Sequence, residues 1–487
     1  MKLYLRNHTE RYPVEQLQLQ LFADEPSEFV TAPFKGDGAV SSLSEGRVYL
    51  TATTKITYRG KTGFSAQRVK LSDADVRRTR RILQRSYYLA AVQVLEKEPV
   101  WGALSGVRPS KLSTKAMLEG ASKKQAEKLL RDVYFVSPAR AKLCADASGY
   151  TVQAKKLLAP GDLSVYIGIP FCPSRCAYCS FVSESIERCG EFLPTYLECL
   201  LREVEYTGQL LRSSGFRIRS VYMGGGTPTT LSSAQMERLL DKIQTSFELS
   251  RSLEFTVEGG RPDTLDEEKL RIIKEGGATR ISINPQTMSD AVLKAVGRRH
   301  TAQQVVEAFE LARRVGFDEI NMDLIAGLPG DTTVSFRDSL TRVLSLDPAN
   351  ITVHTLALKK GAELFQRRVG LPGAQDVADM LEFTETALRG GGYEPYYLYR
   401  QKYMSGSFEN VGWCKPAYPG YYNIYMMEEL HSILSLGGGG MNKINLPEER
   451  LARFHNPKYP QDYISRIDTI LQQKDEIFRL LAEAESI

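Results

Sequence analysis

The 487-residue sequence lacks the features that would place it in or beyond a membrane. No apolar run approaches the roughly 20 residues that a spanning helix needs. The amino-terminal stretch MKLYLRNHTERYP has no apolar core of the kind found in secretory signals. The formal net charge is only +5 and is spread along the chain, so nothing favours nucleic acid as a partner. We therefore expect a cytoplasmic protein with reduced thiols, no membrane span and no nucleic-acid partner.

Cysteine is also scarce. The chain has seven, and four of them are scattered, at Cys144, Cys189, Cys199 and Cys414. The other three, Cys172, Cys176 and Cys179, lie within YIGIPFCPSRCAYCSF at the spacing C-x3-C-x2-C. Three thiolates this close cannot all pair with one another, and a tight loop of thiolates suits a soft metal. The spacing therefore indicates a metal or cluster site.

Two other roles for these cysteines are open. Structural zinc would need a fourth ligand, usually from a second Cys or His pair, and the sequence has no second C-x2-C and no H-x3-H. Disulfides are disfavoured by the scatter of the other cysteines and by the expected reducing compartment. The spacing favours a four-iron cluster, because three protein ligands leave one iron open to a small molecule.

The chain is long enough for two or three domains. We expect an N-terminal α/β domain, a helical connector, a core of alternating strands and helices, and a C-terminal α+β region over the mouth of that core, at 1–100, 101–160, 161–374 and 375–487. In the first domain, strand-like alternation in MKLYLRN, RVYLTATTKITYRG and Ser65–Leu71 precedes a helical pattern over Asp73–Lys97.

The core pattern begins at Leu163 and contains six predicted strands that alternate with helices. The strands are Leu163–Ile169, Ile218–Met223, Leu253–Glu258, Thr279–Asn284, Glu319–Ile325 and Asn350–Leu356. Six βα repeats predict a parallel sheet with helices outside it and with the chemistry at the carboxyl ends of the strands. Beyond Tyr393–Arg400, a tyrosine-rich strand, we expect a loop, a helix that runs into LSLGGGGMNKI, and a helical tail.

Several polar or glycine-rich positions lie at or beyond the ends of the predicted strands. Gly224–Pro228 reads GGGTP, and glycines let backbone approach a ligand closely, although such a loop is also a common tight turn. Glu258 would bind an ammonium or ribose hydroxyls, or else a helix dipole. Gln286 and Arg298 follow, and Arg298 would hold a carboxylate in a fork. Asp323 interrupts an apolar strand, so it should have a partner.

The chain from about 163 to 446 resembles the oxygen-independent coproporphyrinogen III oxidase family of radical S-adenosylmethionine enzymes. The resemblance rests, in order, on YIGIPFCPSRCAYC, GGGTPT, FTVEGGRPDT, SINPQT, VGRRHT and MDLIAGLPGD. It implies a partial (β/α)6 barrel. The long N-terminal part, GVRPSK and YYLYRQKYMSGSFENVGW are most similar to the HemZ-type branch, named coproporphyrinogen dehydrogenase.

The resemblance also implies residue roles. The three cysteines Cys172, Cys176 and Cys179 would bind a [4Fe–4S] cluster and carry the catalysis. The first S-adenosylmethionine would contact Tyr166, Gly225 and Glu258. A neighbouring site, which in the family takes a second such molecule, would be lined by Gly226, Thr227, Gln286, Arg298, Asp323 and Ala357. Side chains facing the substrate would be Tyr399, Arg400, Gln401 and Lys402.

The implied activity is oxidative decarboxylation of two propionates of coproporphyrinogen III, giving protoporphyrinogen IX in anaerobic heme biosynthesis. The electron donor would be a protein such as a flavodoxin or ferredoxin. Two alternatives stand beside it: a heme chaperone without oxidase activity, and a radical enzyme that methylates or opens another tetrapyrrole.

Three positions depart from the family pattern. Gly168 stands where the family usually has histidine, and Phe181 stands where the well-studied oxidases have a fourth cysteine. The chaperone branch carries a His-Asn pair before a tryptophan, and the matching place here is Glu409-Asn410. The missing histidine counts against a chaperone.

Overall fold

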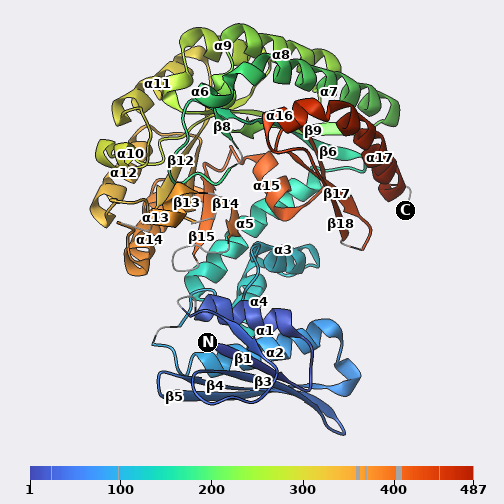
Figure 1. The fold of residues 1–487 in the computed structure, drawn as a ribbon, viewed down its shortest axis with the longest axis vertical. Coiled ribbons are helices and arrows are strands. Elements are labelled where there is room, and N and C mark those ends of the chain that lie inside the picture. The colour runs from blue at the N-terminus through green and yellow to red at the C-terminus, as the bar shows by residue number, and fades with distance from the viewer. Residues whose placement is uncertain are drawn as a thin grey trace. The chain divides into compact units, whose positions relative to one another are not determined.

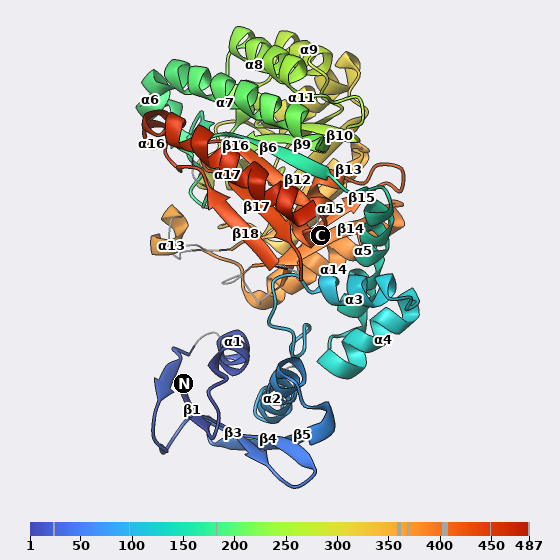
Figure 2. The same cartoon turned by 90° about the vertical axis from the view of Figure 1, so that its right-hand side faces the viewer.

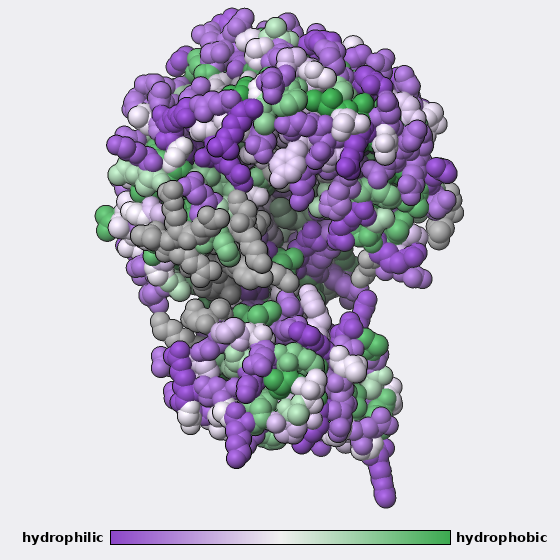
Figure 3. Space-filling view, viewed as in Figure 1, coloured by the Kyte–Doolittle hydropathy of each residue, from purple (hydrophilic) through white to green (hydrophobic). Residues whose placement is uncertain are grey.

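The computed structural model describes residues 1–22, 25–96, 98–181, 183–357, 362–367, 370–401, 408–448 and 450–485. The chain forms two compact units, Met1–Ala145 and Asp146–Ile487. Hydrophilic side chains predominate on the face shown in Figure 3. Within the described residues, no helix has the length and apolar character to cross a membrane. The expected domain boundaries at 100, 160 and 374 stay predictions.

The first unit is built on a five-stranded sheet in the order β2-β1-β3-β4-β5. These strands are β1 Lys2–Arg6, β2 Glu28–Val30, β3 Gly38–Glu45, β4 Tyr49–Tyr58 and β5 Lys61–Lys70. Helices α1 (Arg11–Leu21) and α2 (Val76–Ala91) pack on the sheet, and their side chains Leu17 and Tyr87 join its buried core. Helix α2 begins at Val76 rather than at Asp73 because Asp75 caps it, accepting the Arg78 N–H, and it ends at Ala91, before the expected end at Lys97. Helices α3 (Ser110–Leu118) and α4 (Lys123–Tyr134) follow in this unit, and α5 (Pro138–Lys156) begins in it and continues into the second unit.

The second unit contains an eleven-stranded sheet in the order β14-β15-β13-β12-β11-β10-β9-β6-β16-β17-β18. The six predicted parallel strands are confirmed as β6 Asp162–Ile169, β9 Arg217–Gly225, β10 Glu254–Gly260, β11 Arg280–Ile283, β12 Glu319–Ala326 and β13 Asn350–Thr355. Strand β15 (Glu409–Cys414) extends the sheet antiparallel to β13, and β14 (Glu394–Arg400) pairs with β15.

The helices form an outer layer around these strands (Figure 1). They include α7 Leu193–Ser214, α8 Ser233–Ser246, α9 Glu267–Glu275, α10 Asp290–Ala295, α11 Ala302–Val315, α12 Thr333–Ser345 and α14 Ala374–Gly390. Strand β6 shows how the two faces differ. Its apolar residues Leu163, Val165 and Ile167 are fully buried, whereas Tyr166 and Gly168 point to the opposite face. Because the other parallel strands alternate in the same way, polar and aromatic side chains gather inside the barrel.

The region after Cys414 departs from the sequence expectation. The expected loop and helix are instead α15 (Tyr421–Glu428) followed by three strands, β16 Ser432–Gly437, β17 Met441–Leu446 and β18 Arg450–His455. Strand β16 runs parallel to β6, with Gly437 opposite Gly168. A Cβ on Gly168 would lie 2.6 Å from the Gly438 carbonyl oxygen. Close backbone packing against β16 therefore explains why no histidine stands at position 168.

The helical tail is confirmed as α16 (Pro460–Ser465) and α17 (Ile467–Glu485), and α17 lies beside β17 and α7 (Figure 2). A buried ion pair joins it to the barrel: Lys474 Nζ lies 3.1 Å from Glu203 Oε1 on α7. The other Glu203 oxygen accepts hydrogen bonds from the Gly437 N–H (2.8 Å) and the Tyr463 hydroxyl. These bonds hold the last strands against β6, the strand that leads into the cysteine loop.

Candidate radical S-adenosylmethionine site

The three cysteines lie in one loop that follows β6. Cys172 ends the short strand β7 (Phe171–Cys172), and all three thiols are free and half-buried. The loop is held on both sides, because the Ala177 N–H donates to the Val296 carbonyl and its own carbonyl accepts from Leu364, each at 3.0 Å. Burial raises the pKa of Cys172, and it raises the pKa of Cys179 to about 11. Metal binding would offset this cost by stabilising the thiolates.

The glycine loop after β9 contacts the cysteine loop directly. The Gly226 N–H donates to the Ile169 carbonyl at 2.8 Å, and the Thr227 N–H donates to the Phe171 carbonyl at 2.7 Å. The Thr227 hydroxyl lies 3.5 Å from Cys172 Sγ. A Cβ on Gly226 would lie only 2.4 Å from the Phe171 carbonyl oxygen, so no side chain fits there. Two motifs about 45 residues apart thus form one surface.

Glu258, at the end of β10, faces the glycine loop. The Tyr222 hydroxyl donates to its Oε1, and a Cβ on Gly224 would lie 2.8 Å from its Oε2. Burial raises the pKa of Glu258 to about 7, although the Tyr222 hydrogen bond opposes the rise. A carboxylate desolvated in this way gains from a cationic ligand. Sequence reasoning missed Tyr222, whose only signal is its inward position in β9.

Three tyrosine rings line the interior next to Glu258. Tyr222 and Tyr422 stack with ring centroids 4.6 Å apart, and Tyr166 lies 6.3 Å from Tyr222 and 6.4 Å from Tyr422. Burial raises the pKa of each hydroxyl, so all three stay neutral. Tyr166 was expected in the site, whereas Tyr422 comes from α15, where the sequence predicted a loop. The stack gives the site a flat aromatic wall.

Asp323 and Gln286 meet on the next strands. Gln286 adopts a left-handed backbone (φ 67°), and its N–H donates to the Asp323 carbonyl at 2.8 Å. The Asp323 side chain accepts from Asn321 Nδ2 at 2.8 Å and lies 3.7 Å from His354 Nε2. The expectation that Asp323 has a partner is therefore confirmed. His354 was not singled out, because its inward position follows from the pairing of β12 with β13.

Arg298 is buried where the ends of β10 and β11 meet the cysteine loop. Its guanidinium donates to the carbonyls of Asn284 (2.7 Å) and Gly260 (3.1 Å) and to the Tyr178 hydroxyl (3.1 Å). Beside it, the Asn284 Oδ1 atom is buried and has no hydrogen-bond partner among the described residues. An unsatisfied buried oxygen at this end of the sheet fits a bound ligand.

The remaining expected residues lie further along the interior. Ala357 is half-buried just after β13. In β14, burial raises the pKa of Tyr399 to about 12, and Asp323 adds to the rise. The Gln401 amide lies 3.5 Å from the Tyr399 hydroxyl. Because neighbouring strand residues alternate, Arg400 points away from the face of Tyr399. Lys402 lies outside the described residues.

The donor set fits a cluster with S-adenosylmethionine. The three half-buried thiols would bind iron, and the glycine loop would let the backbone approach the ligand closely. The desolvated Glu258 would bind an ammonium group. Among the described side chains, no group of three or more His, Cys, Asp and Glu converges on a single metal ion. The thiolates of a cubane bind different irons, so such convergence is not required of them.

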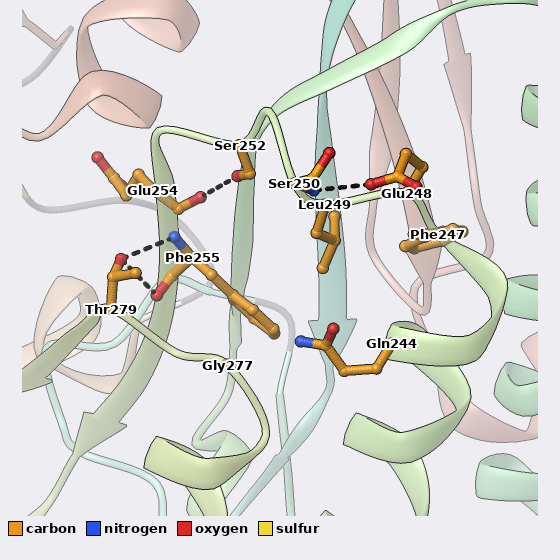
Figure 4. A pocket seen from close by; sticks show the side chains of 10 residues that line it. All are labelled: Gln244, Phe247, Glu248, Leu249, Ser250, Ser252, Glu254, Phe255, Gly277 and Thr279. Carbon is orange, nitrogen blue, oxygen red and sulfur yellow. Dashed lines mark hydrogen bonds between the residues drawn. The ribbon is translucent and has the colours of Figure 1, made fainter.

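A separate cavity of about 380 Å³ lies at the opposite end of the strands (Figure 4). Its lining includes Glu254 and Phe255 at the start of β10, Gln244 on α8, and Gly277. Since Glu258 is at the other end of β10, this cavity is distinct from the cysteine site. None of the expected site residues lines it.

Comparison with known proteins agrees with this geometry. The radical SAM superfamily matches residues 166–343. The solved structure titled "Coproporphyrinogen III oxidase (HemN) from Escherichia coli is a Radical SAM enzyme" shares the fold, with a TM-score of 0.53 and 24% identity over 66% of this chain and 72% of that one. The barrel, cysteine loop and glycine loop thus define a radical S-adenosylmethionine protein.

Two curated relatives narrow the class. The oxygen-independent coproporphyrinogen-III oxidase-like protein HemZ of Bacillus subtilis is 35% identical over 94% of this chain and 92% of its own length. The heme chaperone HemW of the same organism is 34% identical over 53% of this chain and 69% of its own length. The chain belongs to the oxygen-independent coproporphyrinogen III oxidase-like family of radical S-adenosylmethionine proteins.

Proposed function

We propose that this protein oxidatively decarboxylates two propionates of coproporphyrinogen III to give protoporphyrinogen IX. The observation that carries the proposal is the similarity to the oxidase-like HemZ along almost the entire chain, including the N-terminal unit. The site supports radical chemistry, because the cysteine loop, the glycine loop and Glu258 adjoin one another. The reaction would take place in the cytoplasm, with a tetrapyrrole as substrate.

Cys172, Cys176 and Cys179 would hold the [4Fe–4S] cluster. When bound, the cluster and S-adenosylmethionine would supply a one-electron cleavage of a C–S bond and a carbon radical that abstracts hydrogen from a propionate side chain. Loss of carbon dioxide would release one further electron, which would pass to an external electron acceptor. The Thr227 hydroxyl lies 3.5 Å from Cys172 Sγ and would orient this thiolate toward its iron. Gly225 and Gly226 would let the backbone approach the amino-acid part of S-adenosylmethionine.

Glu258 would bind the ammonium group in its ionised form. Because burial raises its pKa to about 7, the carboxylate is partly protonated near neutral pH and releases that proton when the cation binds. Tyr222 would fix the carboxylate, and the tyrosine rings would exclude water. The set Gln286, Arg298, Asp323 and Ala357 would line the neighbouring site, where a second S-adenosylmethionine stays a prediction.

A heme chaperone is the second candidate, since HemW is 34% identical over about half of this chain. The pair that corresponds to the chaperone's His-Asn is Glu409-Asn410, at the start of β15. Both side chains are buried, and Asn410 Oδ1 accepts the Thr355 N–H at 2.8 Å. Asn410 is thus used to join β15 to the end of β13, which favours the oxidase proposal over heme ligation there.

Anaerobic turnover tests the proposal. The reconstituted protein is mixed with a reductant, S-adenosylmethionine and coproporphyrinogen III, and the products are analysed by mass spectrometry. Loss of two carbon dioxide molecules together with 5′-deoxyadenosine is expected. Heme binding without any turnover would favour the chaperone, and a methylated or linear tetrapyrrole would favour a different radical enzyme.

A further inference from the structure

One histidine of the barrel has no structural bond. His354 lies on β13, its Nε2 atom is 3.7 Å from Asp323 Oδ2, and 28% of its side chain is exposed. That separation is longer than a hydrogen bond, and the ring makes none to any residue that the structure describes. The chain has five histidines, and three others bond to protein atoms through a ring nitrogen, namely His8, His300 and His431. The fifth, His455, is exposed on β18.

The His354 ring faces the same interior as the expected site residues. Alternation along β13 turns Thr352 and His354 inward, where the Thr352 hydroxyl donates to Asn321 Oδ1 on β12 at 3.2 Å. Burial raises the pKa of Glu258 to about 7, Asp323 adds to the rise, and His354 opposes it. These three ionisable groups therefore share one electrostatic environment at the carboxyl end of the strands.

The charges at this end favour cationic ligands unless His354 is protonated. Toward the carboxyl ends of β10, β12 and β13, the inward ionisable side chains are Glu258, Asp323 and His354. Arg298 nearby is already bonded to three protein oxygens, and Arg400 points to the other face of its strand. A tetrapyrrole that carries propionates would be repelled by the two carboxylates alone. Among these described groups, the protonated imidazole of His354 is the one that attracts such a ligand.

Asp323 is placed to orient the His354 ring. Its Oδ1 atom accepts a hydrogen bond from Asn321 Nδ2 at 2.8 Å, so the carboxylate is held, and its Oδ2 atom faces His354 Nε2. A carboxylate beside one ring nitrogen fixes the orientation of an imidazole and leaves the other nitrogen to donate to a ligand. Because contacts of this kind are often long before a ligand binds, the 3.7 Å separation is compatible with that role. Nδ1 is thus the donor available to a ligand.

An aromatic wall adjoins the inward face of β13. The Tyr397 hydroxyl lies 3.5 Å from the Thr352 hydroxyl, two residues before His354. The rings of Tyr397 and Tyr399 are almost parallel, with centroids 6.4 Å apart and planes at 8°. Aromatic rings beside a potential cation suit a ligand that combines a large apolar ring system with acidic side chains.

We propose that His354 binds a propionate carboxylate of the tetrapyrrole through Nδ1, while Asp323 positions its ring. The inference rests on the proposed function for the identity of the substrate and adds a specificity-determining residue to it. His354 forms no covalent bond and moves no proton, so its contribution is to affinity. The carboxylate of S-adenosylmethionine has the same chemistry, but the tyrosine wall beside His354 favours the propionate.

Direct binding is the first test. Coproporphyrin III, the oxidised macrocycle with the same propionates, is titrated into the anaerobically reconstituted full chain and followed by its absorption shift. His354→Gln should weaken binding by at least about tenfold, because it removes a hydrogen bond from a charged donor. His354→Lys restores a cation and should bind more tightly than His354→Gln. His455→Gln is the matched control and should bind as the wild type does, since His455 is exposed on β18. Equal affinities for wild type and His354→Gln, equal affinities for the two His354 variants, or no binding by wild type would overturn the inference.

The second test separates the two sources of a carboxylate and the two proposals. S-adenosylmethionine affinity, measured without tetrapyrrole, should be equal in wild type and His354→Gln. A loss there, with coproporphyrin III affinity unchanged, would overturn the assignment to a propionate. In turnover, His354→Gln should raise KM for coproporphyrinogen III and keep kcat near that of the wild type, as expected when binding alone is lost. A lower kcat with unchanged KM would overturn the inference. A wild type that binds coproporphyrin III through His354 but releases no carbon dioxide from coproporphyrinogen III would contradict the proposed function and leave the binding role of His354 standing.

Discussion

The amino and carboxyl ends of the parallel strands both carry buried charged groups. At the amino end, Arg280 Nη2 lies 2.6 Å from Glu319 Oε2, and its other Nη donates to the Asn350 side chain. Glu254 there accepts hydrogen bonds from the Thr256 hydroxyl and from the Tyr421 N–H. The protein itself supplies partners for both oxygens of that carboxylate.

At the carboxyl end the partners are incomplete. Glu258 keeps a raised pKa despite its bond to Tyr222, and Asn284 Oδ1 lacks a partner among the described residues. Buried polar groups usually find partners inside the fold when their role is structural. Perturbed pKa values and unsatisfied atoms gather where a ligand completes the site. The amino end also keeps an unsatisfied buried atom, Arg280 Nε, so the ends differ in their carboxylates rather than in every polar group. Both oxygens of Glu254 have protein partners, which indicates a structural role, whereas the raised pKa of Glu258 indicates a site that a cationic ligand completes.

The largest effect should come from Cys176→Ala at the carboxyl end. Loss of one of the three thiolates should prevent stable retention of the [4Fe–4S] cluster. We expect iron content and 5′-deoxyadenosine formation to fall to background in anaerobic preparations. The unfolding midpoint of the apoprotein should stay unchanged, because this thiol is only half-buried. A Cys144→Ala control, outside the loop, should retain its iron. Normal activity in Cys176→Ala would break the comparison.

The next effect should be on stability, from Arg280→Met at the amino end. Arg280 Nε also lies 4.0 Å from Glu254 Oε2, so the substitution leaves Glu254 and Glu319 without their cation, and breaking a buried ion pair typically costs about 3–5 kcal/mol. Denaturant unfolding followed by Trp413 fluorescence in a Trp101→Phe background would measure it in the second unit. Arg299→Ala, whose pair with Glu187 is exposed, should cost less than about 1 kcal/mol. Similar losses in both variants would refute a structural role for the Arg280 cluster.

A third test uses Glu258→Gln and pH. Charge-assisted hydrogen bonds contribute about 1.5–3 kcal/mol, so S-adenosylmethionine affinity at pH 8 should fall roughly 10- to 160-fold. Wild-type affinity should rise as pH increases through about 7, because only ionised Glu258 attracts an ammonium. The variant should lose that rise. Calorimetric titrations across the range would detect it, and a pH-independent wild type would contradict the role of Glu258.

The same pKa predicts the stability of the apoprotein. The folded pKa of Glu258 is about 7 and the usual value is 4.5, so the folded state holds the extra proton between these values. Stability should therefore fall as pH rises from about 4.5 through 7. Glu258→Gln should flatten that part of the profile in thermal unfolding. If Glu258→Gln instead made stability fall more steeply with pH than in the wild type, the contribution of Glu258 would have the opposite sign to the one expected.

The smallest effect should come from Tyr222→Phe, which removes one hydroxyl and keeps the ring stack. A single hydrogen bond contributes about 0.5–1.5 kcal/mol, so affinity should fall by roughly 2- to 12-fold. Because the bond lowers the pKa of Glu258, its loss should move the midpoint of the affinity profile to higher pH. Tyr421→Phe, which keeps its backbone bond to Glu254, is the control. A midpoint that moves down would exclude the proposed bond.

The elements that the sequence predicts well are those fixed by local patterns. Alternation and capping residues place the six parallel strands and most helices within a few residues, as Ser232 and Thr301 do with their capping boxes. The cysteine spacing and the GGGTP turn likewise predict which loops form the site. The capping boxes, the cysteine spacing and the GGGTP turn each depend on residues close together in the sequence. They can therefore be predicted without knowledge of tertiary contacts.

The missed features depend on closure of the barrel. The sequence around strand β16 is rich in glycine and resembles a turn. It forms a strand only by pairing with β6, which is distant in the sequence. Tyr222, His354 and Tyr422 acquire meaning only when three separate segments face one interior. The partner of Asp323 could be expected from the cost of burying a carboxylate, but its identity as His354 required the register of β12 with β13.

The pairing of β16 with β6 also has a consequence in time. Gly437 lies opposite Gly168, 269 residues later in the chain. At ~5–20 residues per second, a ribosome would need roughly 13–54 s to supply that neighbour. Until then the edge of β6 lacks this neighbour and the cysteine loop has no finished support. Cluster insertion is therefore expected to follow completion of the chain, which makes delivery of iron and sulfur a post-translational event.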